Sequence, residues 1–268
     1  MSRQLAVFES DRRAVSETLG YILVFSIIVT TITTATVFGF GGLENRQAAE
    51  QVTNVERAFD VMADNFRDIS RDEDPSRATE MRLADGTLSV GDSVTITVGQ
   101  WDNGEFVEGE QENVTFQPLV FQSDGGEVAY ESGVVFRGSG SESIARSPQP
   151  FVVGEETALV PVTATSVGSS TTAVGGDQTA RVVGERRPNS RTLANRTVEA
   201  DGETLAVRIE SPRANGWDRQ LESEGYQNVS YNESTSTVTA DLAVEANGEI
   251  RRPETVRLPV TNIRIRFD

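Results

Sequence analysis

The side chains that most often carry enzyme chemistry are missing from this chain. Among its 268 residues there is no His and no Cys, and all 24 basic residues are Arg. The chain therefore cannot form a Ser-His-Asp triad, a Cys nucleophile, a Lys Schiff base, or a metal site of imidazole and thiolate ligands. We expect no catalytic residue, no metal site and no cofactor, and the sequence predicts that the protein is not an enzyme.

Carboxylates are the reactive groups that remain, and the chain has 41 of them. Asp72, Glu73 and Asp74 could supply oxygen ligands to a hard cation such as Ca²⁺. No EF-hand spacing accompanies them, so a solvated helix end is the simpler interpretation. The abundance of acids also means that no particular glycosidase pair can be nominated. Trp101 and Trp217 are of a type that stacks on sugars, although such residues more often lie in a core or at its rim.

Four Asn residues begin the sequon N-x-S/T, which is the acceptor for N-glycosylation. They are Asn113, Asn195, Asn228 and Asn232. Because this modification occurs on exposed segments outside the cell, the four candidate sites indicate an exterior location for the region that contains them.

The balance of charge restricts the partners. The formal net charge is −17 at pH 7. Such a chain repels a phosphate backbone, so we expect no nucleic-acid partner. At about 1 M salt the Debye length falls to about 3 Å, and the acidic self-repulsion then costs little. We interpret the acid-rich, lysine-free composition as that of a halophile's protein; the alternative is an ordinary acidic protein.

One segment is apolar enough to cross a membrane. Residues 18–43 contain no charged side chain. As a helix they would reach about 39 Å, which exceeds the roughly 30 Å of a bilayer's hydrocarbon core. A cleaved secretory signal is the less favoured alternative, because its apolar region is shorter and ends in a small-x-small cleavage site. We predict a transmembrane helix over residues 15–43, with the lipid bilayer as its partner.

The charges beside the span give it a direction. Arg12 and Arg13 precede it, and the acidic Glu44 opens the far side. By the positive-inside rule, residues 1–14 form a cytoplasmic leader and residues 44–268 lie outside. The sequence therefore predicts a single-pass protein of the cell membrane, with its N-terminus in the cytoplasm and its C-terminal head outside the cell.

The start of the chain resembles a known class of membrane proteins. A short charged leader with the basic residue Arg13 and the small residue Ala14, followed at once by an apolar run from Val15, resembles the class III signal peptide of archaeal type IV pilins. The segment VSETLGYILVF, with GFGGLENRQAAEQ further on, is still more similar to an uncharacterised haloarchaeal pilin-like membrane family. The pilin resemblance covers residues 11–43, and the closer one continues to residue 98.

The resemblance implies that a prepilin peptidase cuts after Ala14 and leaves Val15 as the mature N-terminus, with a cut after Arg13 as the alternative. It also implies other pilin-like subunits as partners. The sequence departs from the pattern at one position. Haloarchaeal adhesion pilins usually have Pro where this chain has Glu17, and bacterial pilins have Glu at the fifth mature position, whereas Glu17 would be the third.

Ser16 and Glu17 suit the start of a helix in a processed chain. Ser16 is a good N-cap, and a carboxylate such as that of Glu17 gains about 0.3–1 kcal/mol beside the positive end of a helix. In an assembly, Glu17 could instead neutralise the free N-terminus of a neighbouring subunit. The Thr-rich second half of the span allows close contact between helices, or its hydroxyls bond only to their own backbone.

An amphipathic helical stalk is predicted for residues 44–74. Its apolar residues recur at spacings of three and four, the pattern of an a/d seam. They are Val52, Val55, Phe59, Met62, Phe66 and Ile69. Because this seam is short for an independent coiled coil, we expect it to pack on the chain's own head. A homo-oligomer formed through the span and the stalk is the alternative.

From residue 75 to residue 268 the apolar pattern changes to period two, which is typical of β-strands. We expect strands at 79–83, 94–98, 114–121, 134–137, 158–165, 191–198, 204–209, 235–244 and 255–266. One helix is expected between Ser211 and Gly225. The pattern predicts an all-β, sandwich-like head, with two lobes divided near residues 146–190 as one arrangement, and a pilin-like α+β fold overall.

Two functions stay open. The first is that of a structural or assembly subunit of the cell surface, such as a minor pilin, which leaves the membrane for a filament through its apolar span. The second is that of a permanently anchored extracellular binding domain, an adhesin or accessory subunit with no role in a pilus.

Overall fold

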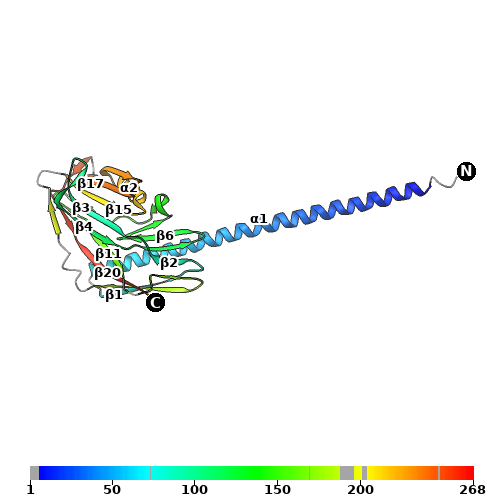
Figure 1. The fold of residues 1–268 in the computed structure, drawn as a ribbon, viewed down its shortest axis with the longest axis horizontal. Helices are drawn as coiled ribbons and strands as arrows, with labels where there is room; N and C mark the ends of the chain where they lie inside the picture. The colour runs from blue at the N-terminus through cyan, green and yellow to red at the C-terminus, as the bar shows by residue number, and fades with distance from the viewer. Residues whose placement is uncertain (1–5, 73, 169, 188–195, 201–203, 247) are drawn as a thin grey trace. The chain divides into compact units, whose positions relative to one another are not determined.

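The structure is a computed structural model that describes residues 6–268 except 73, 169, 188–195, 201–203 and 247. Within this part, it does not describe the side chains of residues 6–16, 37–45, 196–199 and 246. The chain divides into two units, Met1–Gln47 and Ala48–Asp268, and each is described by itself. Figure 1 shows the helix α1 (Ala6–Arg71) and the strands that follow it.

The first unit contains the apolar part of α1. The segment Glu17–Thr36 is long and apolar enough to cross a membrane, and each of its side chains is exposed. Its hydroxyls bond within the helix: Ser26 Oγ donates to the carbonyl of Ile22, and Thr31 Oγ1 to that of Ile27, each at 2.8 Å. The predicted apolar N-terminal helix is therefore confirmed, and these two hydroxyls are satisfied by their own backbone.

The helix begins earlier than the predicted cap. Because α1 begins at Ala6, Ser16 and Glu17 lie inside it and do not start it. The expected capping role does not exist in the uncut chain, since the backbone N–H groups after Ser16 already have carbonyl partners one turn back. It would apply only to a chain cut before Val15, and the side chains of Arg13, Ala14, Val15 and Ser16 lie outside those that the structure describes.

In the second unit, α1 packs on the sheets. Its six seam residues are at most 2 % exposed and share one core cluster with apolar residues of the strands. The Phe66 ring meets that of Tyr130 edge-on at 5.3 Å between centroids. Gln51 Nε2 donates to the carbonyls of Leu83 and Ala84, both at 2.6 Å. Self-association through this seam would require the helix to leave the head.

The predicted β-rich head is confirmed, and in the described part of the chain its strands form four sheets. Sheet A has the order β1 (Ser76–Arg82), β13 (Thr179–Arg186), β20 (Val260–Phe267), β11 (Val162–Val167). Sheet B has the order β12 (Ala173–Gly175), β2 (Thr87–Val90), β5 (Leu119–Ser123), β6 (Gly126–Glu131), β7 (Val134–Arg137), β8 (Ile144–Ala145).

Sheet C has the order β16 (Tyr226–Asn232), β17 (Thr237–Ala246), β15 (Thr204–Glu210), β3 (Val94–Asp102), β4 (Glu105–Phe116), and β18 (Glu249–Arg251) pairs with β17. Sheet D has the order β14 (Arg196–Glu199), β19 (Thr255–Leu258), β10 (Thr157–Leu159), β9 (Val152–Val153). A 3-10 turn (Gly140–Glu142) and the helix α2 (Ala214–Ser223) complete the described elements.

Three prolines account for three of the strands beyond those expected. The runs predicted at 114–121, 158–165 and 255–266 are each interrupted, at Pro118, Pro161 and Pro259. Proline has no N–H to give to a ladder, so a strand ends where it occurs. At each of the last two prolines the chain passes from sheet D to sheet A. The two crossings lie side by side, because β10 pairs in parallel with β19 and β11 pairs in parallel with β20.

Residues 146–190 do not divide the head into lobes. They contribute β9 to β13, and these strands belong to sheets A, B and D. This segment is rich in small and polar residues, but backbone pairing needs no large side chains, so such residues join ladders readily. The head is one compact unit with two core clusters, one around α1 and the other beneath sheet C.

Candidate functional site

The two faces of sheet C differ in chemistry. On β3 and β15, Val98 and Val207 point into the core and are at most 1 % exposed, whereas the neighbouring Trp101 and Arg208 on the other face are partly exposed. The period of two puts alternate residues on opposite faces. The outer face of the sheet is therefore built from residues that the core does not use.

Strand register arranges the outer face in rows. One row crosses the five strands in the order Ser230, Thr239, Arg208, Thr97, Asn113. The next row has the order Asn232, Thr237, Glu210, Thr95, Thr115. Both rows consist of hydroxyl, amide and charged side chains, so this surface presents hydrogen-bonding groups across the width of the sheet.

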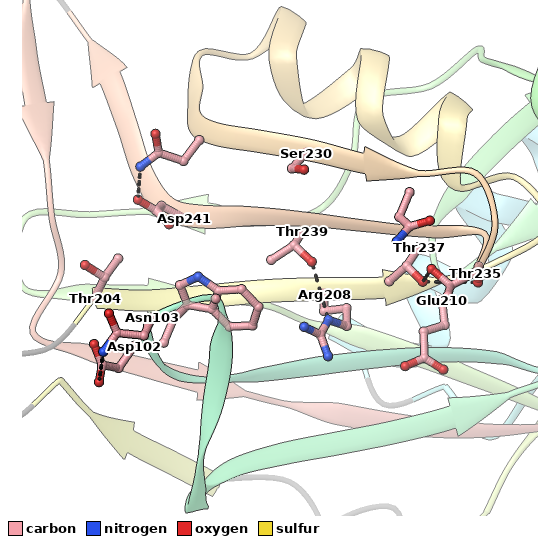
Figure 2. Close-up of a pocket in the computed structure, with 14 residues that line it drawn as sticks. Asp102, Asn103, Thr204, Arg208, Glu210, Ser230, Thr235, Thr237, Thr239 and Asp241 are labelled. Atoms are coloured by element: carbon pink, nitrogen blue, oxygen red, sulfur yellow. Dashed lines mark hydrogen bonds between the residues drawn. The ribbon is translucent and has the colours of Figure 1, made fainter.

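Part of this face is hollowed into a groove of about 970 Å³, which is at the upper end of the range for ligand pockets. We call it the groove of sheet C. It is lined by outer residues of β15, β16 and β17 and by the turn between β3 and β4. Figure 2 shows Ser230, Thr239 and Arg208 on neighbouring strands, with Asp102 and Thr204 towards one end.

An aromatic and cationic cluster lies at the end of the groove near the β3–β4 turn. Asn103 and Gly104 form that two-residue turn with φ of 47° and 92°, the left-handed backbone that a tight hairpin needs. The turn pairs Trp101 with Phe106, whose rings meet edge-on at 4.9 Å between centroids. Arg208 Cζ lies 4.9 Å from the Trp101 centroid and 5.0 Å from that of Phe106. This contact holds the guanidinium in place.

Hydrogen bonds fix other side chains of the groove. Asn228 Nδ2 donates to Asp241 Oδ2 at 2.7 Å, and Arg208 Nε donates to Thr239 Oγ1 at 3.4 Å. Asn228 has a φ of 52°, a left-handed conformation that Asn tolerates better than most residues. The groove is therefore partly preorganised before any ligand arrives.

The electrostatics of the groove exclude anions. Asp102, Glu210 and Asp241 line it, against a single cation, Arg208, among the described lining residues. No group of three or more acidic residues in the described chain could hold a metal ion. The lining therefore suits a ligand that is uncharged or carries positive charge.

A second polar cluster is buried and structural. The Glu131 carboxylate is fully buried and accepts hydrogen bonds from Arg213 Nη1 at 2.9 Å, from Trp217 Nε1 at 2.8 Å, and from the Ser211 hydroxyl at 2.8 Å and 3.0 Å. Arg213 also pairs with Glu127. These contacts hold α2 against β6, and no solvent reaches the carboxylate. Trp217 is thus a core residue, whereas Trp101 belongs to the groove.

The predicted glycosylation sites are divided by the structure. Asn228 and Asn232 are exposed and line the groove, whereas Asn113 is exposed on β4 outside its lining. Asn232 Oδ1 accepts hydrogen bonds from the backbone N–H of Ser234 at 3.0 Å and from its hydroxyl at 2.7 Å. Asn195 lies outside the described residues.

The groove is not evident from the sequence alone. A signal was present, because Thr237, Thr239 and Asp241 alternate with apolar residues along β17. Alternation of this kind marks any strand with one wet face, so it does not distinguish a binding surface from an ordinary one. The informative feature is the contact between Trp101 and Arg208. These residues are more than 100 positions apart in the sequence, and only the pairing of their strands in the sheet brings them together.

Comparison with known proteins gives one result. A model described as "Family of unknown function (DUF7289)" matches residues 13–266, nearly the whole chain. No curated protein and no solved structure matches.

Proposed function

The chain belongs to the family of unknown function DUF7289, and on this premise we propose that it is a membrane-anchored protein of the cell surface whose head binds a polar ligand. The anchor is the apolar part of α1, and the positive charge of Arg12 and Arg13 keeps the N-terminus in the cytoplasm. The sandwich-like head and the helical stalk then belong to the exterior part of a pilin-like α+β protein.

The groove of sheet C is the observation that carries this proposal. It combines a concave surface, side chains held by hydrogen bonds, and an aromatic pair at one end, which are features of ligand sites. No Leu, Ile, Val or Met side chain of the described residues lines it. A polar surface of this kind is stable in contact with water, and its side chains offer many directional hydrogen bonds to a polar molecule.

Surface labelling tests the placement of the head. Because the chain has no Cys, a single Ser141→Cys substitution on the exposed 3-10 turn creates a unique label site. We expect a membrane-impermeant maleimide to label this variant in intact cells as fully as after lysis. Labelling only after lysis would contradict the exterior head. The unmodified chain, which cannot react, is the control.

A pilin-like assembly role is the second proposal, and the division of α1 favours it. The described side chains of Glu17–Thr36 are exposed and mostly apolar, whereas the seam residues from Val52 to Ile69 are buried in the head. An apolar helical part beside a head-packed part resembles the arrangement expected of a type IV pilin.

Mass spectrometry of the N-terminus tests this role. In protein purified from its native membrane, we expect a mature chain that begins at Val15, or at Ala14 if the cut follows Arg13. An intact Met1 or Ser2 would contradict peptidase processing and leave the anchored head as the function. Recovery of the processed chain in sheared surface filaments, without detergent, would then distinguish an assembled subunit from one that stays in the membrane.

A further inference from the structure

We propose that the groove of sheet C binds a short chain of uncharged sugar units. This inference rests on the proposed function, because it names the class of ligand that the anchored head takes. The argument uses the hydrogen-bonding capacity of the groove, its aromatic end, its charge and its size.

The groove offers donors and acceptors in the mixture that sugar hydroxyls require. Each sugar hydroxyl both donates and accepts, and so do the hydroxyls of Thr204 and Ser230. Within the described chain, the side chains of Thr204, Ser230 and Glu210 have no hydrogen-bond partner, so they are available to a ligand. Arg208 adds donors and Asp241 adds acceptors at fixed positions.

The aromatic end supplies the apolar contact that a sugar ring also needs. One side of a pyranose ring is rich in C–H groups, and these pack favourably on the face of an aromatic ring. Trp101 is partly exposed at the groove, and its position is fixed by the edge contact with Phe106 and by the Arg208 guanidinium. A sugar that packs beside Trp101 has the donors of Arg208 within its reach.

The charge and composition of the groove argue against an anionic ligand and against a protein partner. Three carboxylates and one guanidinium line it, so a phosphate or sulfate group would be repelled. A protein partner would need apolar residues at the centre of its interface, and the groove has no aliphatic anchor among its described lining residues. An uncharged, hydroxyl-rich ligand is not repelled by the carboxylates and does not need an apolar interface centre.

The dimensions fit several sugar units. A strand rises about 3.3 Å per residue, so the lining residues Thr204 and Glu210, six positions apart on β15, extend the groove over about 20 Å along the strand. Thr204 and Asn103 lie at one end of the groove and Thr235 and Thr237 at the other (Figure 2). We therefore expect an oligosaccharide to bind more tightly than the corresponding monosaccharide.

The test uses the full chain in detergent micelles. The detergent is lauryldimethylamine oxide, since alkyl glycosides carry sugar headgroups that would compete. The probes are an array of uncharged oligosaccharides of two to eight units, made of glucose, mannose, galactose or N-acetylglucosamine, with oligogalacturonates as the anionic control. Titration of the best array ligand by isothermal calorimetry then gives Kd, and this readout does not depend on Trp101.

Three variants locate the binding. We expect Trp101→Ala to raise Kd by about 10-fold or more, and Ser230→Ala by about 3-fold to 10-fold through loss of one hydrogen bond. Thr115→Ala is the matched control, because Thr115 lies on the same face of sheet C outside the groove, and we expect its Kd to stay within about 2-fold of the parent value. Thermal unfolding of each variant reports its fold, and Ser230→Ala decides the outcome if Trp101→Ala is unfolded.

Three results would overturn the inference: no uncharged oligosaccharide binds, the oligogalacturonates bind more tightly, or the folded groove variants bind as well as the parent chain. Surface labelling of Ser141→Cys separates this failure from that of the proposed function. A chain that is labelled in intact cells but binds no sugar remains an anchored surface protein and loses only the sugar ligand. A chain that binds sugar but is not labelled loses the surface location instead.

Discussion

The two parts of α1 are apolar in different ways. In Glu17–Thr36 apolar side chains occupy all sides of the helix, and large ones such as Ile22 and Phe25 are more than half exposed. Between Val52 and Ile69 they form one stripe, and that stripe is buried while charged residues fill the other sides. One helix thus contains a surface suited to lipid and a surface suited to a protein core.

The comparison shows that the distribution of apolar residues around a helix, and not only their number, decides which surroundings the helix needs. A helix that is apolar all round needs an apolar surrounding on every side, which a bilayer supplies. A helix with a single stripe needs one apolar surface, which the sheets of the head supply. The five predictions below test this contrast, in order of decreasing effect.

The largest effect is expected from removing a buried ring of the stripe. Phe59 is fully buried, so Phe59→Ala should lower the free energy of unfolding of the head by about 3–5 kcal/mol through lost contacts and a cavity. Phe25 is 59 % exposed, and Phe25→Ala should leave this free energy unchanged. Denaturant titration of both variants in micelles, followed by tryptophan fluorescence, measures the difference. Equal losses in the free energy of unfolding for the two variants would contradict the distinction between the two parts of α1.

The second prediction changes the apolar part of α1 and uses its head-packed part as the control. Ile27→Arg places a charge within the predicted span and should oppose insertion by about 3 kcal/mol. Val61→Arg is the matched control, because Val61 is 54 % exposed on the head-packed part of α1. Carbonate extraction of membranes should release more of the Ile27→Arg chain and none of the Val61→Arg chain. Similar retention of all three chains would argue against Glu17–Thr36 as the anchor.

A smaller effect is expected from an ion pair beside the stripe. Glu56 Oε2 accepts from Arg137 Nη1 and Oε1 from Arg146 Nε, both at 2.7 Å. Glu56→Gln should cost about 1–2 kcal/mol, because the arginines are partly exposed and water weakens the attraction. Thermal and denaturant unfolding at pH 7 measure this loss, and an unchanged free energy would show that the bridge is only a surface contact.

The same pair predicts a dependence on pH. Burial alone would raise the pKa of Glu56, but hydrogen bonds and charge from Arg146 and Arg137 outweigh it and hold this pKa below its ordinary value of 4.5. A lowered pKa in the folded state gives stability that is present above pH 4.5 and is lost as pH falls through the folded pKa. The difference between the parent and Glu56→Gln should therefore shrink below pH 4.5.

The smallest effect concerns Asp60, on the same turns of α1. Partial burial, with the charges of Glu56 and Asp64, raises the pKa of Asp60 above 3.8. Like charges four residues apart are unfavourable, so Asp60→Asn should stabilise the head by about 0.5 kcal/mol at pH 7. Because a raised pKa disfavours the ionised form, this gain should disappear below pH 3.8. A loss of stability at pH 7 would contradict the repulsion.

Helices were more predictable than sheets. The apolar segment and the buried seam follow from local spacing, and α2 lies between the predicted Ser211 and Gly225, where Gly225 has a φ of 82°. Most expected strands are present, but Pro118, Pro161 and Pro259 divide three of them, and strands such as β6, β13 and β16 lie outside the expected runs. Which strands become neighbours depends on contacts between distant parts of the chain, and a pattern of period two carries no information about the partner strand.

The sequence by itself determined the excluded chemistry, the apolar helix, the buried stripe and the β-rich head, because each depends on residue types or on spacing within a few turns. The tertiary structure alone decided which strands share a core with α1, that residues 146–190 join three sheets, and that Trp101 lies beside Arg208 at the end of a polar groove. The reason is physical: strand pairing brings together side chains from distant segments, and a binding surface is made of that proximity.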